Sequence, residues 1–224
     1  MTSRLSARAI TFGYDSSRAV VEGWNDEFEA GSMTALSGPS GSGKSTRLYL
    51  LALMLALKGG RIVLDGERVD NLSDAARARL RASRFGFVFQ DAALDPTRTV
   101  LDNVLESALY CGADRRSWTR RAMTLLDEMD VTVPISRRPG QLSGGQAQRI
   151  AVCRALVGAP DVVFADEPTG NLDPTSASAV LRTLRRHADA GACIVLVTHD
   201  PHVADLCDRR RDLVQGDVGS GDMA

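Results

Sequence analysis

A glycine-rich run in the first quarter of the chain limits what it can fold into. Residues 38–45 read Gly-Pro-Ser-Gly-Ser-Gly-Lys-Ser, which fits the pattern G-x-x-x-x-G-K-[ST] at every fixed position. Glycines let the backbone N–H groups of such a loop turn towards an anion, and no Cβ blocks its approach. Residues 33–37 predict a short buried strand before the loop, and residues 46–57 predict a helix after it. We therefore expect a loop that binds nucleotide phosphates, with Lys44 at the β- and γ-phosphates and the Ser45 hydroxyl on Mg²⁺.

Length and composition exclude several other classes of protein. The chain has 224 residues, of which 44% are hydrophobic and 25% charged, as in ordinary globular proteins. Its net charge of −1 lacks the basic footprint of a protein that binds nucleic acid. Four scattered cysteines without C-x-x-C spacing are expected to be small apolar side chains in a reducing compartment. The longest apolar run, residues 48–57, is too short to span a bilayer and no signal peptide is visible, so we expect a cytoplasmic protein.

Alternating strand and helix patterns predict an α/β fold. Further strands are expected at residues 61–66, 85–89, 161–165 and 193–197. Further helices are expected at residues 73–82, 100–110, 117–129, 143–157, 174–189 and 201–207. Strands that alternate with helices imply a mostly parallel sheet that is covered on both faces. Alternating apolar residues before about Gly31 predict two or three antiparallel strands in addition.

The same patterns predict how the chain is divided. Helical spacing without a strand signal fills about 91–157, so we expect an inserted helical subdomain there. About 1–90 and 158–216 are expected to form the P-loop core with its antiparallel β subdomain. The Gly/Asp-rich tail at 217–224 is expected to be frayed. We therefore predict one domain over 1–224.

Two acids end one of the predicted strands. Asp166 and Glu167 directly follow the apolar residues 162–165. The first acid at a strand end near a phosphate loop typically holds Mg²⁺. The second can act as a general base on the attacking water. Solvated acids at an ordinary strand end are an equal alternative for this dipeptide taken alone.

A second glycine-rich turn lies at residues 142–146, just before a predicted helix. Ser143 can cap that helix, and Gly144 and Gly145 expose backbone N–H groups at its positive end. The chain would then have two anion-binding helix ends. Both could hold one ATP if two copies of the chain faced each other head to tail. A glycine turn with an ordinary N-cap is the alternative.

Two polar residues stand just past other predicted strands. His199 could sense a γ-phosphate and orient water, although a lone histidine is more often structural. Gln90 could meet Mg²⁺ or the water, although by itself it indicates nothing. Either residue indicates a function only in combination with the other motifs of the chain.

Taken together, these motifs resemble those of ABC-transporter ATP-binding subunits. The family's order and approximate spacing are matched by the phosphate loop, Gln90, residues 142–146, Asp166 with Glu167, residues 171–173 and His199. The resemblance covers about 3–216. Residues 87–104 and 142–149 are similar, more narrowly, to the LolD/MacB/FtsE group. Members of that group serve lipoprotein release, macrolide or peptide export, and cell division.

The resemblance implies a role for each matching position. Glu167 would be the general base and His199 the γ-phosphate switch, with Gln90 as the third catalytic residue. Mg²⁺ would be surrounded by Ser45, Gln90 and Asp166. ATP would be held by Tyr14, which stacks on adenine, and by Gly38, Pro39, Ser40, Gly41, Ser42, Gly43, Lys44, Ser45 and Thr46. The partner copy would add Ser143, Gly144, Gly145 and Gln146, with Asp173 linking the two sites across the dimer.

The resemblance also implies partners and a location. The subunit would form a homodimer in the ATP-bound state and would lie on the cytoplasmic face of the plasma membrane, attached to a separate FtsX/MacB-like permease. ATP hydrolysis would power export or extraction of a lipoprotein, peptide or drug-like substrate. An FtsE-like ATPase that regulates cell-wall hydrolysis without transport is the alternative, since its catalytic residues would be the same.

Two further classes fit the sequence poorly. A chromosome ATPase of the SMC kind would place a long coiled coil between its two motifs, whereas the roughly 100 residues between Lys44 and Ser143 show no sustained heptads. Translation-factor ABC proteins normally carry two cassettes, and this chain has one.

Several positions depart from the pattern of the LolD/MacB/FtsE group. Arg47 stands where that group commonly has leucine, and residues 58–60 replace a proline-containing turn. Asp95 and Arg98 lie in a segment that is usually more apolar and that should face the permease. We expect these changes to affect packing and partner contacts and to leave the nucleotide chemistry intact.

Overall fold

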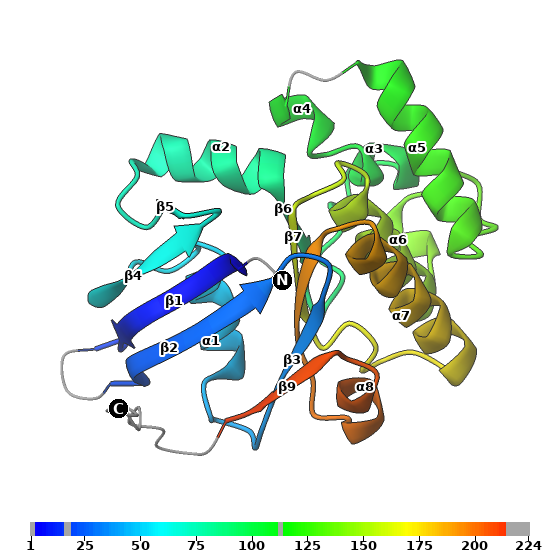
Figure 1. Ribbon diagram of the computed structural model, residues 1–224. Helices are drawn as coiled ribbons and strands as arrows, with labels where there is room; N and C mark the ends of the chain where they lie inside the picture. Colours follow the sequence, from blue (N-terminus) through cyan, green and yellow to red (C-terminus); the bar gives the residue numbers. More distant parts are fainter. Residues whose placement is uncertain (1–2, 16–18, 112–113, 214–224) are drawn as a thin grey trace.

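The chain folds into two sheets with helices around them (Figure 1). The computed structural model describes residues 3–15, 19–111 and 114–213. The predicted frayed tail at 217–224 lies outside these residues. One sheet is antiparallel, with strand order β2-β1-β4-β5, and the other is parallel, with strand order β6-β7-β8-β3-β9.

The strands and helices agree with the predicted α/β class. The antiparallel sheet comprises β1 (Ser3–Phe12), β2 (Val21–Glu29), β4 (Gly59–Leu64) and β5 (Glu67–Arg68). The parallel sheet comprises β3 (Met33–Ser37), β6 (Phe85–Val88), β7 (Val162–Asp166), β8 (Cys193–Val197) and β9 (Arg209–Asp212). The helices are α1 (Lys44–Leu51), α2 (Asp74–Arg84), α3 (Val100–Val104), α4 (Ala108–Cys111), α5 (Arg115–Glu128), a 3₁₀ turn at Pro139–Gln141, α6 (Gly144–Leu156), α7 (Pro174–Asp189) and α8 (Pro201–Asp205).

The parallel sheet separates two hydrophobic cores. Successive side chains of a strand point to opposite faces. In β7, Val163 and Ala165 therefore pack with helices α3, α5, α6 and α7. Val162 and Phe164 pack on the other face with α1 and the antiparallel sheet. The sheet is buried on both faces, as its apolar strands predict.

Two helices differ from the sequence prediction. The helix after the phosphate loop ends at Leu51 instead of continuing to residue 57, because Leu53 adopts a left-handed backbone with φ of 57°. The single helix expected at 100–110 is wrong as well. The chain there forms α3 and α4, separated by a turn in which the Ala108 N–H donates to the Leu105 carbonyl.

Between β6 and β7 the described residues form helices and no strand. Their buried side chains nevertheless join the same core as β7 and β8. The division of the chain into a core and a helical subdomain therefore stays a prediction. Among the described helices, none is both long enough and apolar enough to cross a membrane.

The cysteines are free, as expected, and two of them, Cys153 and Cys193, are buried. Burial raises the pKa of the Cys193 thiol to about 12 and that of Cys207 to about 11. Both thiols therefore stay protonated at neutral pH and are poor nucleophiles.

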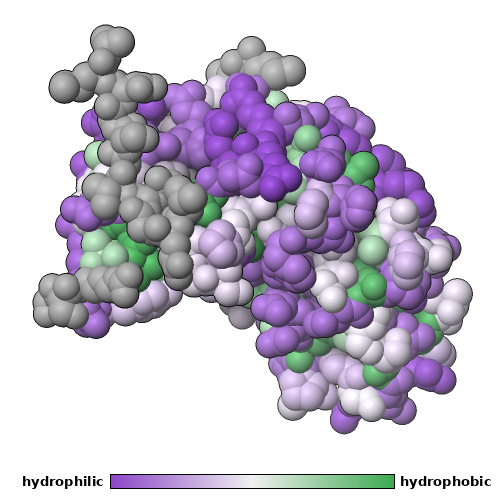
Figure 2. All heavy atoms as spheres, turned by 90° about the horizontal axis from the view of Figure 1, so that it is seen from below, coloured by the Kyte–Doolittle hydropathy of each residue, from purple (hydrophilic) through white to green (hydrophobic). Residues whose placement is uncertain are grey.

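Seen from below, the surface is mostly hydrophilic, with hydrophobic residues in small separate spots (Figure 2). Outside the grey residues, this face therefore offers no broad apolar area for a partner.

Candidate functional site at the carboxyl edge of the parallel sheet

The phosphate loop connects β3 to α1 through glycines in conformations that other residues avoid. Gly38, Gly41 and Gly43 have φ of 144°, 79° and 79°. A Cβ on Gly38 would lie 2.3 Å from the carbonyl oxygen of Leu213, so no larger residue fits. Gly43 is the N-cap of α1 and no side chain caps that helix. The first N–H groups of α1 are therefore available to an anion in the loop.

The lysine of the loop lies against the loop's own backbone. Lys44 Nζ donates to the carbonyl oxygens of Gly38, at 2.8 Å, and Pro39, at 2.9 Å. These bonds hold its positive charge within the loop, where an anion would meet it.

Tyr14 presents an exposed ring next to the start of α1. The Tyr14 and Phe12 rings pack nearly at right angles with centroids 5.0 Å apart, and the Tyr14 hydroxyl oxygen lies 3.2 Å from Thr46 Oγ1. An exposed aromatic face held in this way can stack on a planar base.

The other predicted site residues follow neighbouring parallel strands. Carboxyl ends of parallel strands share one edge of the sheet, which is the usual ligand-binding edge of open α/β sheets. Gln90 is exposed just after β6, Glu167 follows β7 and His199 follows β8. Ser45 joins this group directly, because its hydroxyl donates to Asp166 Oδ1 at 3.1 Å.

Glu167 is held in a defined orientation. Its Oε1 lies 2.8 Å from His199 Nδ1, and its backbone N–H donates to the Val197 carbonyl at 3.0 Å. Its φ of 47° is uncommon for a residue with a side chain. The Glu167 side chain is largely buried, whereas that of His199 is exposed. A carboxylate fixed in this way can accept a proton from water.

Asp166 has a partner that the sequence prediction missed. Asp166 is only 4% exposed, and its Oδ2 accepts a hydrogen bond of 2.9 Å from the Tyr49 hydroxyl. Burial and the neighbouring Asp166 raise the pKa of Tyr49 to about 12, so the hydroxyl stays protonated and donates. The spacing along α1 could have predicted this contact, because Tyr49 follows Ser45 by four residues and lies on the same face of the helix.

Arg47, which departs from the family pattern, is packed beneath the loop. It is 1% exposed, and its guanidinium carbon lies 5.5 Å from the centroid of the Trp24 ring. Arg47 therefore contributes to packing, as expected for this position. In addition, Arg47 Nη1 donates to the Ser42 carbonyl at 2.7 Å, so the side chain supports the phosphate loop itself.

The second glycine-rich turn has its own cap. Ser143 Oγ accepts from the Gln146 N–H at 3.2 Å, and Gln146 Oε1 accepts from the Ser143 N–H at 3.0 Å. This reciprocal capping box confirms the cap predicted at Ser143. A Cβ added to Gly144 would meet no atom within 4 Å, whereas one on Gly145 would touch Leu172 at an ordinary distance.

Asp173 also caps a helix in this chain. One carboxylate oxygen accepts from the Thr175 and Ser176 N–H groups, both at 3.0 Å. Hydrogen bonds from Ser176 lower the pKa of Asp173. The sequence prediction gave Asp173 a role between two subunits, and that role stays a prediction.

Helix α6 is hydrogen-bonded to the residues on both sides of Gln90. Gln148 Nε2 donates to the Phe89 carbonyl at 3.0 Å. Arg154 donates to the carbonyls of Ala92, at 2.8 Å, and Ala93, at 2.6 Å, two residues with positive φ. Three backbone carbonyls of this segment are thus held by α6, which begins just after Ser143 in the second glycine-rich turn.

A family model described as ABC transporter matches residues 21–170, about two thirds of the chain. The chain belongs to the ABC transporter family. The lipoprotein-releasing system ATP-binding protein LolD of Paramagnetospirillum magneticum is 40% identical over 210 residues, which cover 93% of this chain and 92% of the relative. The macrolide export ATP-binding/permease protein MacB of Brucella abortus is 40% identical over 199 residues, which cover 89% of this chain but 31% of that protein.

Solved structures agree with this assignment. A dimeric bacterial ABC transporter cassette is similar to this chain, with a TM-score of 0.88 and 30% identity over 95% of each chain. A dimeric post-hydrolysis state of an ATP-binding cassette, bound to ADP and Pi, has a TM-score of 0.87 and 29% identity over 95% of each chain. This ABC ATPase is thus an ATP-binding transporter subunit with the predicted P-loop fold.

Proposed function

We propose that two copies of this ABC ATPase close on two ATP and two Mg²⁺ and drive a separate membrane permease by hydrolysis. The observation that carries the proposal is the Glu167–His199 pair, placed at the same sheet edge as the phosphate loop and Asp166. One chain thus assembles a nucleotide loop, a cation-binding pair and a base.

The oxygen atoms at this edge suit Mg²⁺. Ser45 Oγ and the Asp166 carboxylate lie 3.1 Å apart, and hydroxyl and carboxylate oxygens are ligands that Mg²⁺ accepts. Gln90 would offer an amide oxygen from the end of β6. Among the described residues, no group of three or more His, Cys, Asp or Glu side chains is placed to hold a metal ion by itself, so water and phosphate oxygens would complete the shell. The ion would neutralise charge on the phosphates.

Glu167 and His199 divide the work of hydrolysis. Glu167 would accept a proton from the attacking water, a contribution of roughly 10²- to 10⁴-fold in rate. His199 uses Nδ1 for Glu167, which leaves Nε2 to face the γ-phosphate. Lys44 would exchange its bonds to the loop carbonyls for bonds to phosphate. Tyr14 would stack on the adenine.

A second copy would complete the site. The N-terminus of α6 carries Ser143, Gly144, Gly145 and Gln146, and α6 packs on β6, α3, α5 and α7. In a head-to-tail dimer this end would reach the ATP held by the other copy. The dimeric cassettes of similar fold support this arrangement. Asp173, at the start of α7, would connect the two sites.

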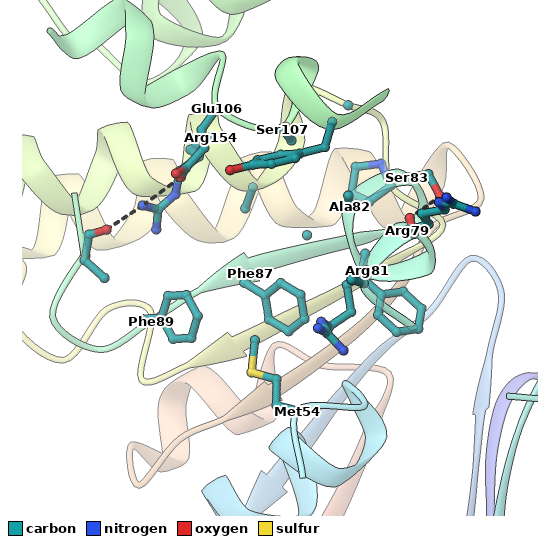
Figure 3. A pocket seen from close by; sticks show the side chains of 18 residues that line it. Met54, Arg79, Arg81, Ala82, Ser83, Phe87, Phe89, Glu106, Ser107 and Arg154 are labelled. Atoms are coloured by element: carbon teal, nitrogen blue, oxygen red, sulfur yellow. Dashed lines mark hydrogen bonds and ion pairs between the residues drawn. The ribbon is translucent and has the colours of Figure 1, made fainter. Parts of the chain in front are cut away.

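A cleft beside the segment after Gln90 suits the permease. It has a volume of about 680 Å³ and is lined by residues of α2, β6, α4 and α6. Figure 3 shows Phe87, Phe89 and Arg81 pointing into it, with Met54 at its edge. Exposed apolar surface of this kind often marks a protein interface. With Arg79 and Arg81 among its lining residues, the cleft would accept a short amphipathic segment that carries an acidic residue.

The names of the relatives favour one class of task. They describe lipoprotein release and macrolide export, so export or extraction of a lipoprotein, peptide or drug-like molecule is the proposed task. The permease would hold this subunit at the cytoplasmic face of the membrane.

The nucleotide part is tested by comparing hydrolysis and ATP retention in the wild type and Glu167→Gln. The variant should bind ATP and fail to turn it over. Normal turnover would show that Glu167 is not the base.

The permease part is tested by capturing partners from native membranes with tagged Glu167→Gln and ATP. Met54→Glu should abolish capture of a permease, whereas Met123→Glu should not, because Met123 is equally exposed (38% against 39%) and lies outside the cleft. Cell-wall hydrolase partners would favour the FtsE-like regulator. The absence of any membrane partner would contradict the proposal.

A further inference from the structure

We infer that Tyr49 is a positioning residue that fixes the Asp166 carboxylate for Mg²⁺ binding. The inference rests on the proposed function, which places Mg²⁺·ATP at Ser45 and Asp166. Tyr49 lies outside the residues that the family resemblance marks as functional.

The two oxygens of Asp166 have different partners. Oδ1 accepts from Ser45 Oγ at 3.1 Å, and Oδ2 accepts from the Tyr49 hydroxyl at 2.9 Å. Both hydroxyls come from α1, one turn apart, so one helix donates a hydrogen bond to each oxygen of the carboxylate. The rotation of the carboxylate is thereby fixed relative to the phosphate loop.

The two bonds have different fates when a cation binds. Ser45 is the residue expected to turn its hydroxyl to the cation, so Oδ1 loses this partner and faces the cation site. Tyr49 is on the other oxygen and has no such competing role. Oδ2 therefore stays anchored in both states, which keeps Oδ1 aimed at the cation.

The anchor itself is rigid. The Tyr49 ring packs against the core formed by α1, the antiparallel sheet and one face of the parallel sheet. Asp166 is 4% exposed, so water cannot easily replace a lost hydroxyl. Hydrogen bonds that orient a metal ligand in this way typically contribute about 10- to 100-fold to metal affinity.

The test is Tyr49→Phe, which removes one oxygen and keeps the packed ring. Binding of a fluorescent ATP analogue to the purified chain is measured across a Mg²⁺ titration and again in EDTA. We expect the half-saturating Mg²⁺ concentration to rise at least about tenfold, with affinity in EDTA unchanged. The melting temperature in EDTA, compared with that of the wild type, reports whether the fold is intact.

A double-mutant cycle separates positioning from a general effect on the site. The readout is the ratio of nucleotide Kd in EDTA to that in Mg²⁺. Tyr49→Phe should lower this ratio when Asp166 is present and leave it unchanged in Asp166→Ala. An equal drop in both backgrounds would show that Tyr49 does not act through Asp166.

The outcomes distinguish the inference from the proposed function. If Mg²⁺ does not strengthen nucleotide binding by the wild type, the proposed Mg²⁺ site is wrong and the inference falls with it. If the wild type responds to Mg²⁺ and Tyr49→Phe responds identically, only the positioning role of Tyr49 is overturned.

Discussion

The N-termini of α1 and α6 are both rich in glycine, but only one is closed by its own side chains. At α1, Gly43 caps the helix through its backbone conformation alone and leaves the first N–H groups without a side-chain partner. At α6, Ser143 and Gln146 satisfy each other's backbone N–H groups. Without a ligand, α6 is therefore the more complete structure.

This difference indicates how the two ends are used. The end of α1 lies beside Lys44, Asp166 and Glu167, so it can bind a nucleotide within one chain. The end of α6 is capped by Ser143 and Gln146, and neither of these side chains is a cation or a carboxylate base. We therefore expect it to add to a nucleotide that is already bound by another copy.

The largest effect on nucleotide binding is expected at the N-terminus of α1, which no side chain caps. Lys44→Ala removes the charge from the loop and should weaken ATP binding by up to about 100-fold, since a charged hydrogen bond contributes up to about 3 kcal/mol. Fluorescence titration with an ATP analogue measures this effect. Lys58→Ala is the control, because Lys58 is the chain's other lysine and is exposed outside the loop. Equal affinity in Lys44→Ala and the wild type would refute the α1 site.

The next effect separates binding from chemistry at the same end. Glu167→Gln should lower the hydrolysis rate by about 10²- to 10⁴-fold because the base is lost. ATP affinity should stay within about threefold, since the hydrogen bonds of Glu167 to described residues join it to Val197, Gly170 and His199, all outside the phosphate loop. Phosphate release and equilibrium binding measure the two quantities. A joint fall in both would mean that Glu167 acts in binding.

A smaller effect is expected at the capped end. Gly144→Ala should lower hydrolysis and ATP-dependent pairing by about tenfold, the loss of about one contact. The added Cβ meets no atom of its own chain, so the subunit's fold and its own nucleotide affinity should not change. Gly140→Ala, at an equally open glycine, serves as the control. Unchanged hydrolysis in Gly144→Ala would argue against a second copy at this end.

The smallest effect on nucleotide binding is expected at Arg47, which packs beneath the phosphate loop. Arg47→Leu removes the bond to the Ser42 carbonyl, and nucleotide affinity should fall about threefold to tenfold because the loop is less well held. Leucine leaves the buried Ser42 carbonyl without this donor, so the free energy of unfolding should fall by about 1 to 3 kcal/mol. Calorimetric unfolding and nucleotide titration check both statements. A loss of several kcal/mol with normal affinity would make Arg47 purely structural.

Strong local patterns made most of the fold predictable. The apolar strands β3, β7 and β8 are buried on both faces and read as continuous hydrophobic runs. Strand β9 was missed because its sequence is Arg-Arg-Arg-Asp, and its arginines are accommodated by acidic partners such as Glu29 and Asp26. No apolar alternation marks such an edge strand.

For the candidate site, the sequence predicted where residues lie better than it predicted which side chains they contact. Motif spacing placed Asp166, Glu167 and His199 correctly at one sheet edge, because parallel strands align their ends. The contacts between side chains could not be predicted from the sequence in the same way. The burial of Arg47 depends on how α1 packs near Trp24 of β2, and the bond from Tyr49 to Asp166 depends on how α1 packs against β7. No motif specifies either arrangement.

The central claim is that the capped end of α6 serves the nucleotide of a second copy. Light scattering on Glu167→Gln gives the most direct test, because ATP then stays bound. The account predicts that Mg²⁺·ATP converts particles of 24.0 kDa to twice that mass, and that Gly144→Ala added to Glu167→Gln reduces this conversion. A chain that binds ATP fully and stays at 24.0 kDa would contradict the account.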